Sequence, residues 1–200
     1  MHPKLSSRLV EPMVTAVPPV CGRKQPYPTT HHDQGATMHK TDIETLIAYN
    51  FWADNEILTA CTHISVADFT RQVAPNPGWH SLRGTLVHLL DTEYGWRAAL
   101  QNLPDDGVLD EADFPDVSSL RARWQTEAAA WQAYVADLDE AALNAVWREE
   151  ATIQRTRWQT ILHVINDGTH HRSEAAAILT GYGRSPGELD FEGYLVWMGK

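Results

Sequence analysis

The stretch Thr156 to Gly181, TRWQTILHVINDGTHHRSEAAAILTG, has the pattern of one long amphipathic helix. Its first four residues form a capping box, in which the Thr156 hydroxyl and the Gln159 side chain satisfy backbone donors at a helix start. Apolar residues then recur at spacings of three and four, the period of a helix with one buried face. Gly168 lies inside it at a cost of about 1 kcal/mol relative to alanine. The helix is expected to stop at Gly181.

Three further segments show the same helical period. A capping box at Thr41 to Glu44 predicts a first helix that reaches Cys61, and Ser81 is expected to cap a second that ends near Asn102, before Pro104. A third is expected from Asp116–Ser119 to about Leu138. Residues 144–154 are mixed and are expected to form an irregular or extended crossing. Four helices of about 20 residues with few strand signals predict an all-α fold, a four-helix bundle of antiparallel type.

The composition excludes several classes of protein. The 200 residues carry 16 Lys and Arg against 26 Asp and Glu, a formal charge of −10, and no dense basic run, so nucleic acid is not an expected partner. No apolar stretch approaches the ~20 residues of a membrane span, so no membrane partner is expected. Cys21 and Cys61 form no ligand or redox spacing, which favours a reducing, cytoplasmic compartment.

The composition changes at about residue 38. Six of the 11 prolines lie before Met38, and all eight tryptophans lie after it. Because residues 1–37 show no apolar periodicity, we expect a disordered N-terminal extension or a start codon assigned too early. Residues 38–200 are expected to form a single bundle domain.

Four residues able to ligate a metal share one face of the helix predicted for 156–181. His163, Asp167, His170 and His171 fall within a sector of about 100° around the helix axis. Either pair spaced by four residues, His163 with Asp167 or Asp167 with His171, can converge on a divalent ion. A third ligand must come from another helix, and His88 stands among leucines where a neutral bundle would place a leucine. The alternative is that His88 is a hydrogen-bonded core histidine and that His170 and His171 face solvent.

Three segments carry a resemblance to a known family: Tyr49–Asp54 (YNFWAD), Leu86–Leu90 (LVHLL) with Trp96, and His163–Arg172 (HVINDGTHHR). At these residues the chain resembles the DinB/YfiT-like family of metal-binding bundle proteins. The resemblance spans Met38 to about Gly183, and its last segment is the most specific. It implies a four-helix bundle, commonly dimeric, that holds one divalent ion through three histidines.

Carried over to this chain, the family's ligand positions are His88, Asp167 and His171. The family usually has histidine at the middle position, so the site expected here has two histidines and one aspartate. These ligand types suit zinc, nickel, manganese or iron. Glu174 is a candidate acceptor for the second ring nitrogen of a ligand histidine, which would fix its tautomer.

Some members of the family resemble thiol transferases, in which the ion activates a low-molecular-weight thiol. We therefore expect a metal-dependent enzyme, a thiol transferase or hydrolase-like protein, that acts on a small molecule. Trp52 and Trp96 are the expected pocket walls, and His170 or His163 the expected proton shuttles. The alternative is a non-catalytic, stress-associated bundle dimer whose metal site is structural or vestigial.

Overall fold

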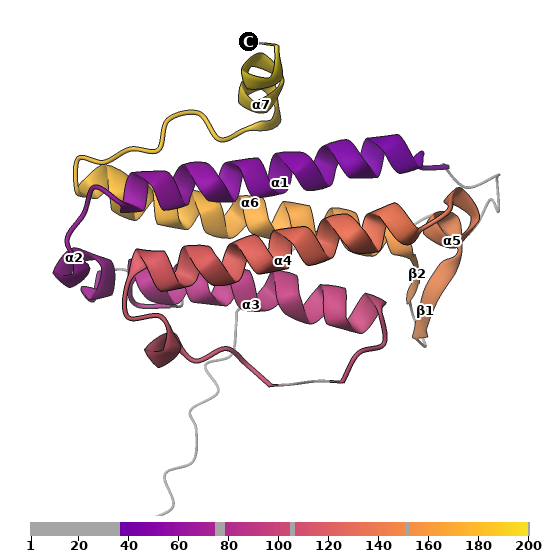
Figure 1. The fold of residues 1–200 in the computed structure, drawn as a ribbon, viewed down its shortest axis with the longest axis horizontal. Helices are drawn as coiled ribbons and strands as arrows, with labels where there is room; N and C mark the ends of the chain where they lie inside the picture. Colours follow the sequence, from indigo (N-terminus) through magenta and orange to yellow (C-terminus); the bar gives the residue numbers. More distant parts are fainter. Residues whose placement is uncertain (1–36, 75–78, 105–106, 151–152, 200) are drawn as a thin grey trace, which may run out of the picture. The chain divides into compact units, whose positions relative to one another are not determined.

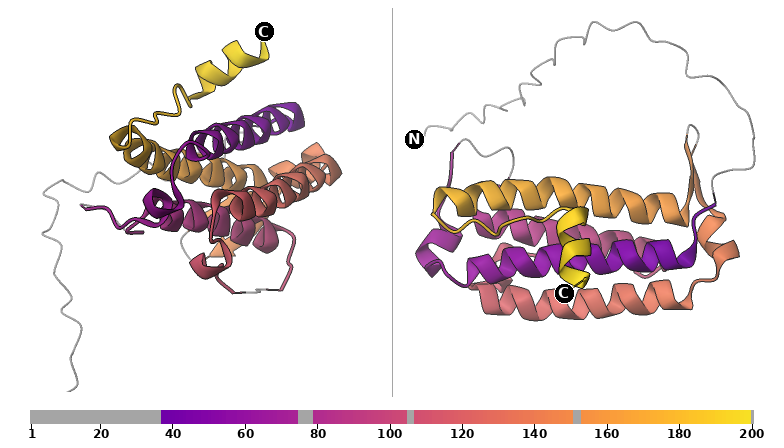
Figure 2. Two further views of the ribbon diagram at one scale, coloured as in Figure 1. Left: turned by 60° about the vertical axis from the view of Figure 1, so that its left-hand side comes forward. Right: turned by 90° about the horizontal axis from the view of Figure 1, so that it is seen from above.

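The computed structural model describes residues 37–74, 79–104, 107–150 and 153–199. Four long helices run side by side (Figure 1): α1 (Lys40–Cys61), α3 (Leu82–Leu100), α4 (Val117–Asp137) and α6 (Arg157–Gly181). Helices α1 and α3 each pack against both α4 and α6, so the four helices occupy the corners of a bundle. The left view of Figure 2 shows this arrangement. The predicted all-α, four-helix bundle is confirmed.

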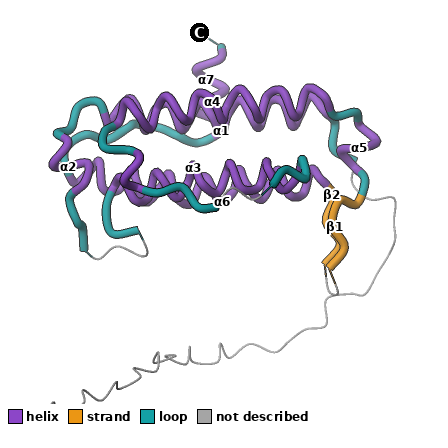
Figure 3. The backbone as a smooth tube through the Cα atoms, turned by 60° about the horizontal axis from the view of Figure 1, so that its bottom comes forward, coloured by secondary structure: helices purple, strands orange, loops and turns teal. Residues whose placement is uncertain are grey.

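Short elements join the long helices at the ends of the bundle. Helix α2 (Val66–Thr70) follows α1, and the 3-10 helix η1 (Glu111–Asp113) precedes α4. Helix α5 (Glu140–Asn144) leads into the antiparallel hairpin of β1 (Val146–Glu150) and β2 (Ile153–Thr156), which Figure 3 shows at one end of the bundle. The irregular or extended crossing expected for 144–154 corresponds to these two strands, and residues 151–152 lie outside the described residues. Helix α7 (Phe191–Met198), which the sequence pattern did not predict, lies across α1.

Three of the predicted helix starts are confirmed by their caps. Ser81 accepts a hydrogen bond from the backbone N–H of Gly84, and Asp116 accepts one from Ser119. Thr156 and Gln159 form the predicted capping box. These side chains satisfy backbone donors that have no partner within the helix, which fixes where each helix begins.

The capping box predicted at Thr41–Glu44 is wrong. Helix α1 begins at Lys40, and its N-cap residue is His39, whose side chain makes no capping bond. The preceding residue is held by a tertiary contact instead, because the Met38 backbone N–H donates to Asn144 Oδ1 at 2.9 Å and the Asn144 amide donates back to the Met38 carbonyl at 3.0 Å. The backbone is therefore held at Met38, about one helical turn before Thr41, and the helix begins before Thr41 could serve as its N-cap.

A polar layer divides the hydrophobic core into two parts. One apolar cluster lies around the second half of α1 and the first half of α3, and the other lies around the first half of α1 and of α6. Between them are four buried side chains that share hydrogen bonds: Asn50, Asp54, Glu93 and Arg172. This layer is described further below because it borders the candidate site.

Two sequence-based expectations concern other parts of the chain. The extension expected for residues 1–37 lies, apart from Thr37, outside the described residues. No helix among the described residues is long and apolar enough to cross a bilayer.

Candidate metal centre

His88, Asp167 and His171 come together where α3 and α6 pack against each other. The imidazole rings of His88 and His171 meet edge to face, with centroids 4.7 Å apart and planes at 87°. Asp167 lies one turn before His171, and its Oδ2 is 3.8 Å from His171 Nε2. His171 is buried, whereas His88 and Asp167 are partly exposed. The three ligand positions predicted from the sequence are therefore neighbours that come from two helices.

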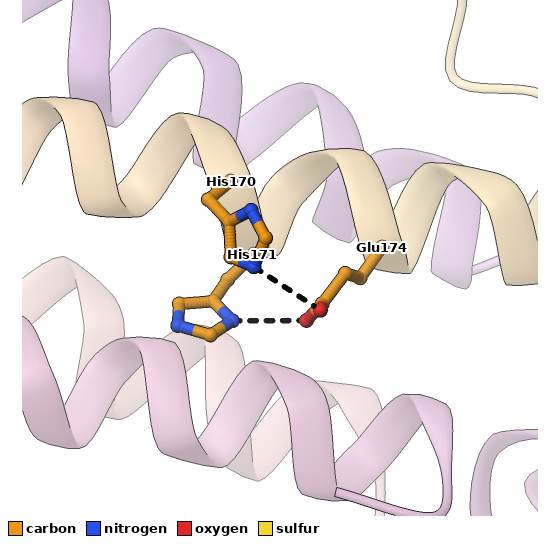
Figure 4. A group of neighbouring side chains, drawn as sticks. All are labelled: His170, His171 and Glu174. Carbon is orange, nitrogen blue, oxygen red and sulfur yellow. Dashed lines mark hydrogen bonds and ion pairs between the residues drawn. The ribbon is translucent and has the colours of Figure 1, made fainter. Parts of the chain in front are cut away.

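Glu174 contacts both neighbouring histidines of α6 (Figure 4). Its Oε2 is 2.9 Å from His171 Nδ1, and its Oε1 is 3.3 Å from His170 Nε2. One ligand atom from each of these three residues lies within 4.8 Å of the others, so this group could also hold a metal ion. Among the described residues, the predicted set His88, Asp167 and His171 is not such a group, although it shares His171 with it.

The bond to Glu174 bears on which nitrogen of His171 is free. A carboxylate accepts hydrogen bonds, so the 2.9 Å contact is satisfied when Nδ1 carries the proton and Nε2 has the lone pair. Nε2 is the nitrogen that faces Asp167. The contact therefore favours ligation through Nε2, with Glu174 as the outer partner that orients the ring.

His88 is held between α6 and an aromatic side chain. Trp79 stacks on its ring with centroids 3.7 Å apart and planes at 14°, and Thr92 Oγ1 lies 3.5 Å from its Nε2. Burial lowers the pKa of His88 below its ordinary value, and the nearby His171 lowers it further, while neighbouring carboxylates act in the opposite direction without reversing the shift. A lowered pKa keeps the imidazole neutral near pH 7, the form that ligates metals.

A tight backbone contact positions Trp79. Its carbonyl oxygen lies so close to Gly84 that a Cβ at that position would be 2.2 Å away, and the next residue, His80, has a positive φ of 60°. Only glycine permits this approach of the loop to the first turn of α3. The role of Trp79 does not follow from helical periodicity; the available signal in the sequence was an aromatic residue just before a capped helix.

A cavity of about 310 Å³ opens beside His88. Its walls are largely apolar and come from Trp79, Val87, Val108 and Leu109, with Gly84 exposing backbone between them. The two carboxylates at its edge, Asp91 and Glu111, are engaged by the Leu109 backbone N–H and by Arg83. The cavity therefore presents an apolar surface next to an imidazole.

The tryptophans expected to wall this cavity lie elsewhere. Trp52 packs against Tyr194 and Trp197 of α7 and borders a different cavity. Trp96 lies edge to face with His163, at 5.1 Å between ring centroids. Neither is among the residues that line the cavity beside His88, where Trp79 supplies the aromatic wall. Trp79 precedes α3 by a short loop, and helical periodicity contains no information about such a contact.

The two expected proton shuttles differ in position. His170 is exposed and reaches Glu174. His163 is also exposed but precedes His171 by eight residues, a rise of about 12 Å along α6, and it contacts Trp96 instead. The structure thus brings His170, and not His163, next to His171.

The buried polar layer connects α6 to the rest of the bundle directly beside the candidate centre. Arg172, the residue after His171, donates to Asn50 Oδ1 at 2.8 Å and to Asp54 Oδ1 at 2.9 Å on α1. Asn50 in turn donates to Glu93 on α3 at 2.6 Å. The indole of Trp124 donates to the same Glu93 carboxyl at 2.8 Å, which extends the layer to α4. These bonds fix the height and rotation of α6 relative to its neighbours.

The fold and the site together define a helical bundle with candidate metal ligands on two adjacent helices. The model of the DinB family matches residues 37–199, and the chain belongs to that family. A comparison with curated proteins finds no match. Among solved structures, the chain is similar to a conserved protein from Enterococcus faecalis, with 17% identity and a TM-score of 0.56 over 71% of this chain and 96% of that one. That similarity supports the fold.

Proposed function

We propose that the protein binds one divalent metal ion through His88, Asp167 and His171 and acts as a metal-dependent enzyme on a small molecule. The observation that carries the proposal is the proximity of two imidazole rings from different helices, with centroids 4.7 Å apart, and of a carboxylate 3.8 Å from one of them. Two imidazoles and one carboxylate suit zinc, nickel, manganese or iron. Three protein ligands leave coordination positions free, which is typical of catalytic sites.

The residues around the site fit the presence of such an ion. Glu174 would hold the proton at His171 Nδ1 and leave Nε2 as the donor atom. Trp79 would hold the ring of His88 in one orientation by stacking on it. These two contacts would fix the orientation of the ligand rings before an ion binds, which lowers the free-energy cost of assembling the site.

The cavity beside His88 gives the substrate a place to lie. A bound divalent ion can polarise an oxygen or stabilise a thiolate, and both chemistries suit a thiol transferase or a hydrolase-like enzyme. The apolar walls of the cavity, Trp79, Val87 and Val108, would bury an uncharged part of the substrate and exclude water from the reacting group. His170, which is exposed and contacts Glu174, would exchange protons with solvent.

Metal content distinguishes this site from the competing donor set. We would measure bound metal by elemental analysis of protein purified without a histidine tag, for the wild type and for His88→Ala, Asp167→Ala and His170→Ala. The proposal predicts about one ion per chain in the wild type, loss in the first two variants and retention in the third. Loss in His170→Ala with retention in Asp167→Ala would assign the metal to His170, His171 and Glu174 instead.

If the protein holds no ion after loading with zinc, nickel, manganese and iron, the proposal of a metal-dependent enzyme is overturned. The remaining candidate would then be the non-catalytic bundle. Circular dichroism of each variant controls for loss of the fold.

A further inference from the structure

A second cavity, of about 540 Å³, lies between α1 and the segment that ends in α7. It shares no lining residue with the cavity beside His88. Two kinds of side chain give it its character, indoles and carboxylates: Trp52, Trp197, Glu56, Glu188, Asp190 and Glu192. We call it the aromatic–acidic cavity. Figure 2 shows α7 crossing α1.

The two indoles form a corner. The ring centroids of Trp52 and Trp197 are 6.2 Å apart and their planes meet at 41°, so the rings are tilted and not stacked. Tyr194 supports both, at 5.6 Å from Trp52 and 6.0 Å from Trp197. Trp197 is 53% exposed. Both indoles line the cavity, so aromatic surface is available beside its carboxylates.

Among the described residues, the carboxylates of the aromatic–acidic cavity have no cationic partner. No Lys or Arg is among its lining residues. Within the described chain, Glu56, Glu188 and Glu192 form neither a hydrogen bond nor an ion pair, and Asp190 caps α7 by accepting the Gly193 N–H at 2.8 Å. The amino end of α7 contributes about half a positive charge, which four carboxylates exceed. The cavity therefore carries uncompensated negative charge beside aromatic faces.

We propose that the aromatic–acidic cavity binds an organic ammonium ion, a cation whose charge is spread over alkyl groups. Indole faces attract such ions, which are weakly hydrated and bring apolar surface with them. A metal ion would instead need several carboxylate oxygens at one point. Among the described residues, no three ligand atoms of these carboxylates lie within 4.8 Å of one another. Carboxylates that are spread around the cavity suit an organic ammonium ion, whose charge is diffuse, better than a metal ion.

The test uses tetramethylammonium chloride as the probe and the indole N–H signals of the full chain as the readout. Trp52→Phe and Trp197→Phe assign the two signals in a nitrogen–proton NMR spectrum. At constant ionic strength, tetramethylammonium is expected to shift both signals and to saturate. Sodium chloride is expected to leave them unchanged. The neutral compound 2,2-dimethylpropan-1-ol, which has nearly the same shape, is expected to bind at least about fivefold more weakly.

Matched variants separate the cavity from the surrounding surface. Trp197→Ala removes an exposed wall and is expected to weaken binding by about fivefold. Leu195→Ala, on the same helix and 49% exposed but outside the cavity lining, is the control and is expected to bind as the wild type does. Glu56→Gln is expected to weaken binding about two- to fivefold, and Glu44→Gln, on the same helix outside the cavity, to leave it unchanged.

Four outcomes would overturn the proposal. They are shifts that do not saturate, equal affinity for the neutral alcohol, wild-type affinity in Trp197→Ala, and calcium chloride acting at lower concentration than tetramethylammonium. The proposal does not rest on the metal site. His88→Ala is therefore expected to bind the probe as tightly as the wild type.

Discussion

The guanidinium of Arg172 donates a 2.9 Å hydrogen bond to the carboxylate of Asp54, and both side chains are almost completely buried. Arg172 directly follows His171, so consecutive residues of α6 contact α1 through the ion pair and His88 of α3 through the imidazole. A rotation of α6 that broke one contact would displace the other. The polar layer and the candidate metal centre are therefore coupled by geometry.

Replacing Arg172 by methionine is expected to lower the free energy of unfolding by about 3–5 kcal/mol, because it leaves the buried carboxylate of Asp54 without its cation. Urea denaturation followed by circular dichroism measures the change. Arg83→Met is the matched control, since Arg83 pairs with Glu111 at 3.2 Å in a partly exposed position, and it is expected to cost no more than about 1 kcal/mol. Equal costs for the two variants would contradict a special role for the buried pair.

The polar layer also predicts how stability depends on pH. Burial raises the pKa of Glu93 well above its ordinary value, and the charge of Asp54 raises it further, while Arg172 and the bonds from Asn50 and Trp124 act in the opposite direction. A raised pKa means that the folded chain keeps a proton that the unfolded chain has lost. The contribution of Glu93 to stability is therefore fully present below the ordinary pKa of glutamate and is lost as the pH rises through the folded-state pKa.

Glu93→Gln replaces the titrating carboxyl group by an amide that does not titrate. The substitution should therefore flatten the dependence of the free energy of unfolding on pH. In the wild type, one retained proton lowers the free energy of unfolding by about 1.4 kcal/mol per pH unit over that interval. As the pH rises from 5 to 8, we expect the free energy of unfolding of the wild type to fall relative to that of Glu93→Gln. Parallel curves, measured by urea denaturation across that range, would show that Glu93 is ionised in the folded protein.

Gly168 is predicted to resist substitution although it lies inside a helix. A Cβ there would be 2.9 Å from Arg172 Nη1 and 3.0 Å from Asn50 Oδ1, so alanine would displace the polar layer. We expect Gly168→Ala to destabilise the protein by about 1–3 kcal/mol. Gly95, inside α3 with nothing within 4 Å of an added Cβ, is the control, and Gly95→Ala should stabilise by up to about 1 kcal/mol. Thermal unfolding of both variants checks the opposite signs.

The sequence predicted the long helices because each has a local signal. Ser81, Asp116 and Thr156 are capping residues whose partners lie three positions away, and such bonds need no knowledge of the tertiary fold. The start of α1 was misplaced because Asn144, distant in sequence, holds Met38. Helix α7 was missed because eight residues give little more than two turns of periodicity.

The candidate ligands could be predicted because they share one helix face or interrupt a leucine-rich stripe. Asp167 and His171 are one turn apart, and His88 stands where an apolar residue is expected. The pocket wall could not be predicted in this way. Whether Trp79 or Trp96 faces His88 depends on how the loop before α3 folds back over Gly84, which periodicity does not encode.

Cys61 is predicted to be inert in the folded protein. Burial raises the pKa of its thiol to about 12, although Arg121 acts in the opposite direction, and its side chain is fully buried. Because the thiolate is the reactive form, its reaction with a disulfide reagent at pH 8 should be slower than that of a free cysteine by about three orders of magnitude. The measurement uses Cys21→Ser, which removes the second cysteine. Reaction of the native protein at the rate of the urea-unfolded chain would contradict the buried assignment.

Glu174→Gln separates the two roles that Glu174 can have. If it orients His171 by accepting the Nδ1 proton at 2.9 Å, the amide oxygen of glutamine can still accept that bond, but without a charge. Zinc affinity should then fall by about 10- to 100-fold, as found for outer partners of ligand histidines, and should still depend on Asp167. Competition with a chelator of known affinity measures the change. Complete loss of zinc in Glu174→Gln, with Asp167→Ala unaffected, would instead make Glu174 a direct ligand together with His170 and His171.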